Sequence, residues 1–169
     1  MKTMTERQAL GKLTRLCAQG EHCTHEMIEK MDKWQLPAEV RDRCLEYLVK
    51  EKYVDDERYA RFFINDKMKY NHWGRRKIEQ ALWRKGIGRE IYAPLLDEVE
   101  DDAYQELLLP MMRKKWNTIK GRDERERKAK LARWAMGRGY DYALVRKCAE
   151  RMELEMTEEY IGEDYGEEE

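Results

Sequence analysis

The stretch RRKIEQALWRKG, residues 75–86, decides the fold class, because its apolar residues recur at helical spacing. Ile78, Ala81 and Leu82 fall on one side of a helical wheel. Gly86 follows them, where a glycine favours the end of a helix. Residues 75–85 are therefore predicted to form an amphipathic helix with a buried Ile78/Leu82 face.

The stretch KAKLARWAMGRG, residues 128–139, repeats this pattern 53 residues later. Leu131, Trp134 and Ala135 form its apolar stripe, and Gly139 ends it. A helix is predicted before each stretch, beginning near Asp56 and Asp101, and a third helix after it, at 89–99 and 141–152. We expect Ile78, Leu82, Leu131 and Trp134 to be buried.

The chain is accordingly predicted to contain three tandem three-helix repeats. Their expected boundaries are 1–53, 54–100 and 101–152. Residues 153–169 form an acidic segment without an apolar face, and we expect this segment to be disordered. The first repeat fits least well, because Ile28 and Met31 share a face while Asp32 falls in the place of Leu82. We expect an all-α protein, arranged as an elongated, curved helical array.

The net charge of −1 hides an asymmetry along the chain. All 34 Lys and Arg lie within residues 1–152, with 26 of the 35 acidic residues, so this part has a net charge of +8. A basic body favours a polyanionic partner or an acidic protein surface. No apolar run has the length of a membrane span, and the first residues lack a signal-peptide core, so we expect a cytoplasmic protein with reduced cysteines and no membrane partner.

The helix at 75–85 has a second face that the apolar stripe does not explain. Arg76, Gln80, Trp83 and Arg84 lie opposite Ile78 and Leu82. Trp83 either packs against an adjacent repeat or is an exposed aromatic residue suited to anchoring a protein or stacking on a base.

A second basic run, residues 113–130, contains nine Lys and Arg and three acids around Gly121. It is predicted to include a helix end, a loop and a helix start. Cations in such a loop would bind phosphates in a salt-dependent manner, and a mobile, solvated linker is the alternative.

Signals for an enzyme are weak. The chain has no glycine-rich phosphate loop, and no set of Ser, His, Asp or Cys has the spacing of a catalytic triad or dyad. Cys17, His22, Cys23 and His25 lie close together, but their spacing matches no common zinc pattern. We expect a protein without catalytic residues, metal or cofactor.

Residues 53–87 resemble the central segment of the RecX family of RecA regulators. The features that carry the resemblance, in order, are Asp-Asp, an aromatic-Ala pair, a Gly before a helix, and Lys-Gly-Ile after it: Asp55, Asp56, Tyr59, Ala60, Gly74, Lys77, Ile78, Leu82, Lys85, Gly86 and Ile87. The likeness covers roughly residues 40–152, including Lys130, Arg133 and Arg138-Gly139-Tyr140. Arg75 departs from it, because the family often has proline there.

The resemblance implies a non-enzymatic protein that binds RecA filaments on DNA and suppresses strand exchange, ATP hydrolysis and co-protease activity in recombination and SOS-type repair. We expect a monomer whose contacts with DNA are weak or indirect; a general DNA- or RNA-binding helical module and a structural scaffold are the alternatives. The residues expected to meet RecA or DNA are Arg75, Arg76, Lys77, Trp83, Arg84, Lys85, Lys120, Arg122, Lys130, Arg133 and Arg138.

Overall fold

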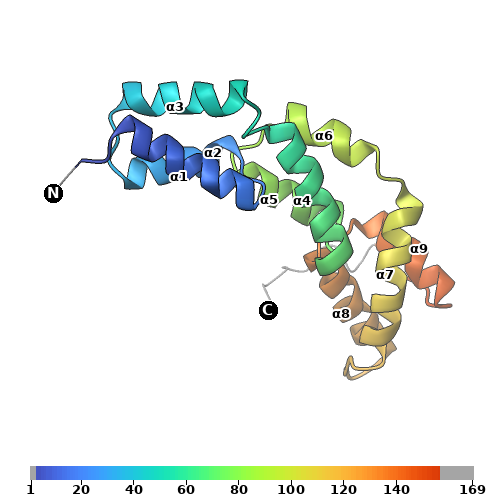
Figure 1. Cartoon of the computed structure of the whole chain (residues 1–169). Helices are drawn as coiled ribbons and strands as arrows, with labels where there is room; N and C mark the ends of the chain where they lie inside the picture. The colour runs from blue at the N-terminus through green and yellow to red at the C-terminus, as the bar shows by residue number, and fades with distance from the viewer. Residues whose placement is uncertain (1–2, 157–169) are drawn as a thin grey trace. The chain divides into compact units, whose positions relative to one another are not determined.

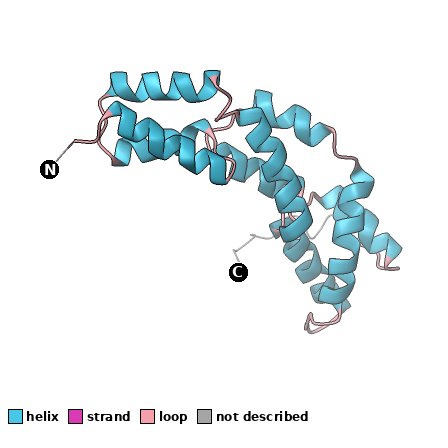
Figure 2. Ribbon diagram, viewed as in Figure 1, coloured by secondary structure: helices cyan, strands magenta, loops and turns pink. Residues whose placement is uncertain are grey.

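The computed structural model describes residues 3–156, and this part consists of helices and loops without a strand (Figures 1 and 2). The all-α prediction is confirmed. None of the helices described is long and apolar enough to cross a membrane. In chain order the helices form three triplets: α1 Glu6–Gln19, α2 Thr24–Lys33 and α3 Ala38–Lys50; α4 Asp56–Asn71, α5 Arg75–Arg84 and α6 Arg89–Asp97; α7 Asp101–Trp116, α8 Glu124–Gly137 and α9 Tyr142–Arg151.

Side-chain caps fix where several helices begin. Thr5 and Gln8 form a capping box at α1, and Asp141 accepts from the Leu144 amide at 2.9 Å to start α9. At α4 the cap is Asp55, whose Oδ1 accepts from the Arg58 amide at 3.0 Å. Asp56 and Asp101, near which α4 and α7 were expected to begin, make other contacts. Asp56 accepts from the backbone N–H of Thr24, and the Asp101 carboxylate lies 3.8 Å from the Lys147 ammonium.

The middle helix of each triplet ends in the same way. A residue with a left-handed backbone follows the helix, at φ 57°, 72° and 102° in Gln35, Gly86 and Gly139. The next residue is buried, and its N–H returns to a carbonyl of the last turn: Leu36 to Met31, Ile87 to Leu82, and Tyr140 to Ala135. This hydrogen-bond pattern is that of a Schellman C-cap, so it aligns the three triplets residue by residue.

The alignment corrects the predicted register of the first triplet. Met27 and Met31 are fully buried, whereas Ile28 is only half-buried. Met31 therefore occupies the place of Leu82, and Asp32 occupies the place of the exposed Trp83. The register was wrong by one residue, because Gln35 occupies the left-handed position where the other two triplets have glycine.

The chain divides into two compact units, each with its own hydrophobic core. One unit comprises residues up to Ile64 together with Ala81–Leu95, and the other comprises Asn65–Gln80 together with residues from Leu96 onward. A core cluster of the first unit is Ala9, Leu13, Met27, Met31, Leu36, Cys44, Leu48 and Val54. The second unit is built around α7, α8 and α9, whose buried residues include Tyr104, Leu108, Met112, Leu131, Tyr140 and Val145.

In each unit, the turn before the middle helix of one triplet is hydrogen-bonded to the turn after the middle helix of the next triplet. We call this contact a joint. In the second unit the Gly74 amide donates to the Arg138 carbonyl at 2.9 Å, and the Arg76 amide donates to the Gly139 carbonyl at 3.0 Å. In the first unit Cys23 occupies the place of Gly74, and its thiol donates to the Lys85 carbonyl at 3.6 Å. The two joints thus use equivalent positions in successive triplets.

Three further expectations differ from the structure. Trp134 is only half-buried, and Lys115 and Arg138 hold their charged groups over its ring, 5.6 and 5.7 Å from its centre. Pro110 interrupts the apolar pattern of residues 101–112, which predicts a helix that kinks or starts late. Helix α7 does not start late, because it runs from Asp101 through Pro110 to Trp116.

The segment after α9 is also more packed than its composition indicates. Leu154 and Met156 are buried in the hydrophobic cluster of α7, α8 and α9. The predicted disorder of residues 157–169 lies outside the described residues.

Candidate functional site: the exposed face of α5 and the α7–α8 loop

Helix α5 divides into a buried and an exposed face, as its sequence predicts. Ile78 and Leu82 have no exposed surface, whereas Arg76 and Arg84 are exposed. Trp83 is 68% exposed, so the interpretation in which it packs against a neighbouring repeat is wrong. The helix therefore presents a large aromatic ring between two arginines, a combination enriched in the centres of protein interfaces.

Neither Arg76 nor Arg84 is neutralised by its surroundings. No acidic side chain of residues 3–156 lies at ion-pair distance from either guanidinium. Both charges are available to a partner without breaking an existing bond, and we take Arg76, Trp83 and Arg84 as the α5 face.

Arg75 belongs to a different arrangement. Its Nε donates to Glu79 at 2.8 Å, and its Nη1 lies 2.7 Å from Asp97. Although partial burial opposes its charge, these two hydrogen bonds raise the pKa of Arg75. Its guanidinium thus joins α5 to the end of α6 and is not free for a partner.

Lys77 and Trp73 form a small cation–π arrangement at the start of α5. The Lys77 ammonium lies 4.9 Å from the centre of the Trp73 ring, and the Lys67 ammonium lies 5.1 Å from it. Such contacts contribute roughly 0.5–1 kcal/mol at exposed sites. Trp73 is half-buried in the turn between α4 and α5.

Lys85 and Arg138 occupy equivalent positions in the two joints. The Lys85 ammonium lies 3.8 Å from the Glu26 carboxylate and is half-exposed. The Arg138 guanidinium donates to the Asn71 carbonyl at 2.6 Å. Both side chains stabilise the joints, and Arg133, another predicted site residue, is half-buried in α8.

Lys120 and Arg122 lie in the loop between α7 and α8, and the side chain of Lys130 reaches this loop from α8. The Lys130 ammonium donates to the Lys120 carbonyl at 2.7 Å, and Arg122 Nε donates to Glu126 at 2.7 Å. The hydrogen bonds from the Arg122 side chain and backbone lower the pKa of Glu126 to about 2. The loop is therefore tied to α8 by specific bonds, which argues against the alternative of a free linker.

Two exposed aromatic residues of α4 were not identified from the sequence. Phe62 is 56% exposed and Tyr70 is 71% exposed. Phe62 and Phe63 form an adjacent apolar pair in the sequence, and such a pair does not reveal which member faces the core. Tyr70 precedes α5 and has the Lys69 ammonium 5.3 Å from its ring centre.

The cysteines and histidines of the first triplet have structural partners. Cys23 is buried, and burial raises the pKa of its thiol to about 12. His22 and His25 lie 3.6 and 3.0 Å from Glu26 and Glu29, one turn further along α2. Across residues 3–156 no three His, Cys, Asp or Glu side chains are grouped to hold a metal ion.

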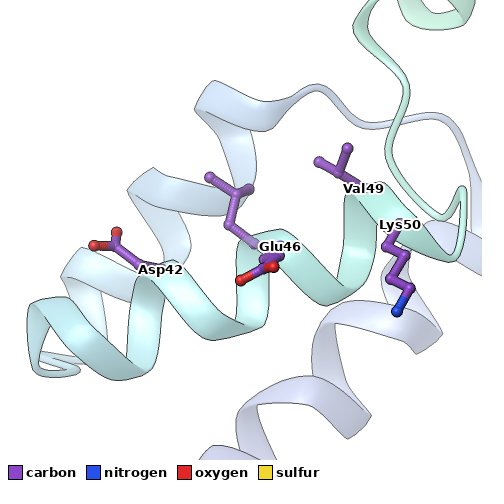
Figure 3. Close-up of a pocket in the computed structure, with 5 residues that line it drawn as sticks. Asp42, Glu46, Val49 and Lys50 are labelled. Atoms are coloured by element: carbon purple, nitrogen blue, oxygen red, sulfur yellow. The ribbon is translucent and has the colours of Figure 1, made fainter.

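A depression on the surface of the first triplet is formed by one helix. Asp42, Glu46, Val49 and Lys50 line it along α3, together with Leu45 (Figure 3). Two acids and one lysine give it no excess of positive charge, and it therefore lacks the basic character of the α5 face. We assign no ligand to it.

The comparisons with known proteins agree with the triplet organisation. Residues 55–93 match the family model described as "RecX, second three-helix domain", and residues 102–148 match "RecX, third three-helix domain". A "Regulatory protein RecX" of Chlorobium limicola is 30% identical over 152 residues, covering 90% of this chain and 94% of the relative. Another of Clostridium perfringens is 27% identical over 129 residues, covering 75% of this chain and 60% of the relative.

Solved structures share the fold. A crystal structure of regulatory protein RecX has a TM-score of 0.80 at 19% identity, with 86% of this chain and 73% of that chain covered. A structure of RecX from Lactobacillus salivarius has a TM-score of 0.80 at 16% identity, with 88% and 96% covered. At these identities the likeness concerns the arrangement of helices.

Proposed function

Because the chain belongs to the RecX family of regulatory proteins, we propose that it binds RecA filaments on DNA and lowers their recombinase, ATPase and co-protease activity. It would act in the cytoplasm, during recombination and SOS-type DNA repair. The observation that carries the proposal is the α5 face, where Arg76, Trp83 and Arg84 are exposed within a segment that the family model matches.

The physical basis of the inhibition is competition. Exposed arginines engage acidic side chains or phosphates with paired hydrogen bonds, and an exposed tryptophan adds a large apolar contact. Bound to a filament, such a face would displace contacts that RecA makes with DNA or with its neighbouring subunit. This role requires no catalytic group.

A second function, general binding of DNA or RNA, is favoured by one observation. An exposed aromatic ring next to arginine is also the arrangement on which nucleobases stack. Under this alternative the affinity would not depend on RecA.

Binding to naked and to RecA-coated single-stranded DNA at two salt concentrations separates the two functions. A filament regulator binds the coated DNA more tightly, and this preference persists at the higher salt concentration. A general nucleic-acid module prefers naked DNA, and its affinity falls steeply with salt. A preference for naked DNA at both concentrations would exclude the RecA-directed function.

A further inference from the structure

Most of the net positive charge of residues 1–152 lies in the third triplet. Residues 101–152 contain 14 Lys and Arg and eight Asp and Glu, a net charge of +6. Residues 1–53 and residues 54–100 each contain ten basic and nine acidic residues, a net charge of +1. The third triplet therefore accounts for most of the surplus.

Within this triplet the excess of basic over acidic residues lies where α7 ends and α8 begins. Arg113 and Lys114 are exposed in the last turn of α7, and neither has an ion-pair partner among the described residues. Lys120, Arg122 and Lys130 continue the surface through the loop. We define the α7–α8 basic cluster as Arg113, Lys114, Lys115, Lys120, Arg122, Arg125, Lys128 and Lys130.

Residues 113–130 contain three acidic residues, and two of them already form local hydrogen bonds or ion pairs. Asp123 caps α8 by accepting from the Glu126 amide at 2.8 Å. Glu126 is shared between Arg122 at 2.7 Å and Lys130 at 3.4 Å. Arg127 is not part of the cluster, because it donates to the carbonyls of Trp116 and Ile119. The cluster keeps a large positive excess after these pairings.

The residues that follow the described part carry the opposite charge. Residues 157–169 contain seven acidic residues and no Lys or Arg. Because Leu154 and Met156 are buried in the cluster of α7, α8 and α9, this segment starts from the same triplet. Thirteen extended residues reach roughly 43–47 Å, whereas α7 is only about 24 Å long.

We propose that the acidic segment 157–169 docks on the α7–α8 basic cluster as an intramolecular polyanion and competes there with nucleic-acid phosphates. The short connection gives the segment an effective concentration of roughly millimolar, so a weak attraction suffices. Salt weakens the docking, because the Debye length falls from about 30 Å at 0.01 M to about 10 Å at 0.1 M.

Carbodiimide cross-linking of the full chain tests the docking without any partner. Carboxylates of residues 157–169 are expected to couple to Lys114, Lys115, Lys120, Lys128 and Lys130 at low salt, and much less at high salt. Lys12, Lys33 and Lys50 of the first triplet are the internal controls. Absence of these cross-links, or equal coupling to the control lysines, would overturn the proposal whether or not the chain acts on RecA.

Binding of a fluorescent oligothymidylate tests the competition. A full-length variant whose seven acids in 157–169 are changed to Gln or Asn is expected to bind roughly 2- to 10-fold more tightly at low salt, and equally at high salt. A variant with the same 13 residues in scrambled order keeps the charge and should resemble the parent chain. Equal affinity of the neutralised and parent chains at low salt would overturn the competition. Truncation after Met152 is unsuitable, because it also removes the buried Leu154 and Met156.

Discussion

Gly74 and Gly139 are in backbone contact at the joint of the second unit, with no room for a side chain on either. A Cβ on Gly74 would lie 2.5 Å from the Gly139 carbonyl oxygen, and a Cβ on Gly139 would lie 2.8 Å from the Gly74 carbonyl oxygen. Gly139 also has φ of 102°, which side-chain-bearing residues rarely adopt. The hydroxyl of Tyr140, the next residue, donates to the His72 carbonyl at 2.8 Å and fastens the same joint.

Gly74→Ala is expected to destabilise the protein by about 1–3 kcal/mol, because the methyl group must push two backbone segments apart. Gly137→Ala is the matched control: Gly137 ends α8 and has nothing within 4 Å of its would-be Cβ. The control should be neutral or stabilising by up to about 1 kcal/mol. Urea denaturation followed by circular dichroism measures the free energy of unfolding of both variants. Equal values would show that the backbone at the joint shifts to accept a methyl group at little cost.

Leu82→Ala is expected to cost roughly 2–5 kcal/mol, because Leu82 is fully buried and its removal leaves a cavity. Trp83→Ala, at the adjacent position, should change stability by only about 0.5 kcal/mol, because the ring is 68% exposed. Thermal melts of the two variants make the comparison. A larger loss for Trp83→Ala would mean that the face assignment of α5 is reversed.

The double change Arg76→Glu with Arg84→Glu should leave the fold intact and weaken binding to RecA-coated DNA by about tenfold or more, because like charges then face the acidic partner. Arg7→Glu with Arg15→Glu makes the same charge change at exposed positions of α1. Titration of RecA's DNA-dependent ATPase compares the two. If both folded variants suppress the ATPase like the parent chain, the α5 face is not the contact surface.

Iodoacetamide at pH 8 should modify Cys17 first in the folded protein. Cys17 is half-buried, whereas Cys23, Cys44 and Cys148 are buried. Burial raises the pKa of Cys23 to about 12, so the reactive thiolate is scarce at pH 8. In guanidinium chloride all four cysteines should react alike. Mass spectrometry of the products gives the order, and native labelling of Cys23 as fast as Cys17 would contradict the buried joint.

The raised pKa of the Cys23 thiol also predicts how the stability of the fold changes with pH. A raised pKa means that folding favours the neutral thiol. The associated stabilisation is complete below the unfolded pKa, near 9, and is lost as the pH rises through about 12. Loss of stability is therefore expected on the alkaline side.

The register of the first triplet marks one limit of inference from the sequence. Gly86 and Gly139 indicate in the sequence where α5 and α8 end, because glycine adopts positive φ without strain. Gln35 adopts the same conformation at the end of α2, where nothing in its residue type indicates it. The positive φ of Gln35, the burial of Leu36 and the hydrogen bond from the Leu36 amide to the Met31 carbonyl reveal the equivalence.

The sequence by itself determined the helices, the buried Ile78/Leu82 and Leu131/Ala135 stripes, and the three-triplet repeat, because helical periodicity is local. Only the tertiary structure decided what each tryptophan and arginine does. Trp83 is exposed, while Trp134 lies beneath two cations. Arg84 has no ion-pair partner among residues 3–156, while Arg138 donates to the Asn71 carbonyl. The physical reason is that exposure and pairing depend on which distant segments pack together, and residue type alone does not specify them.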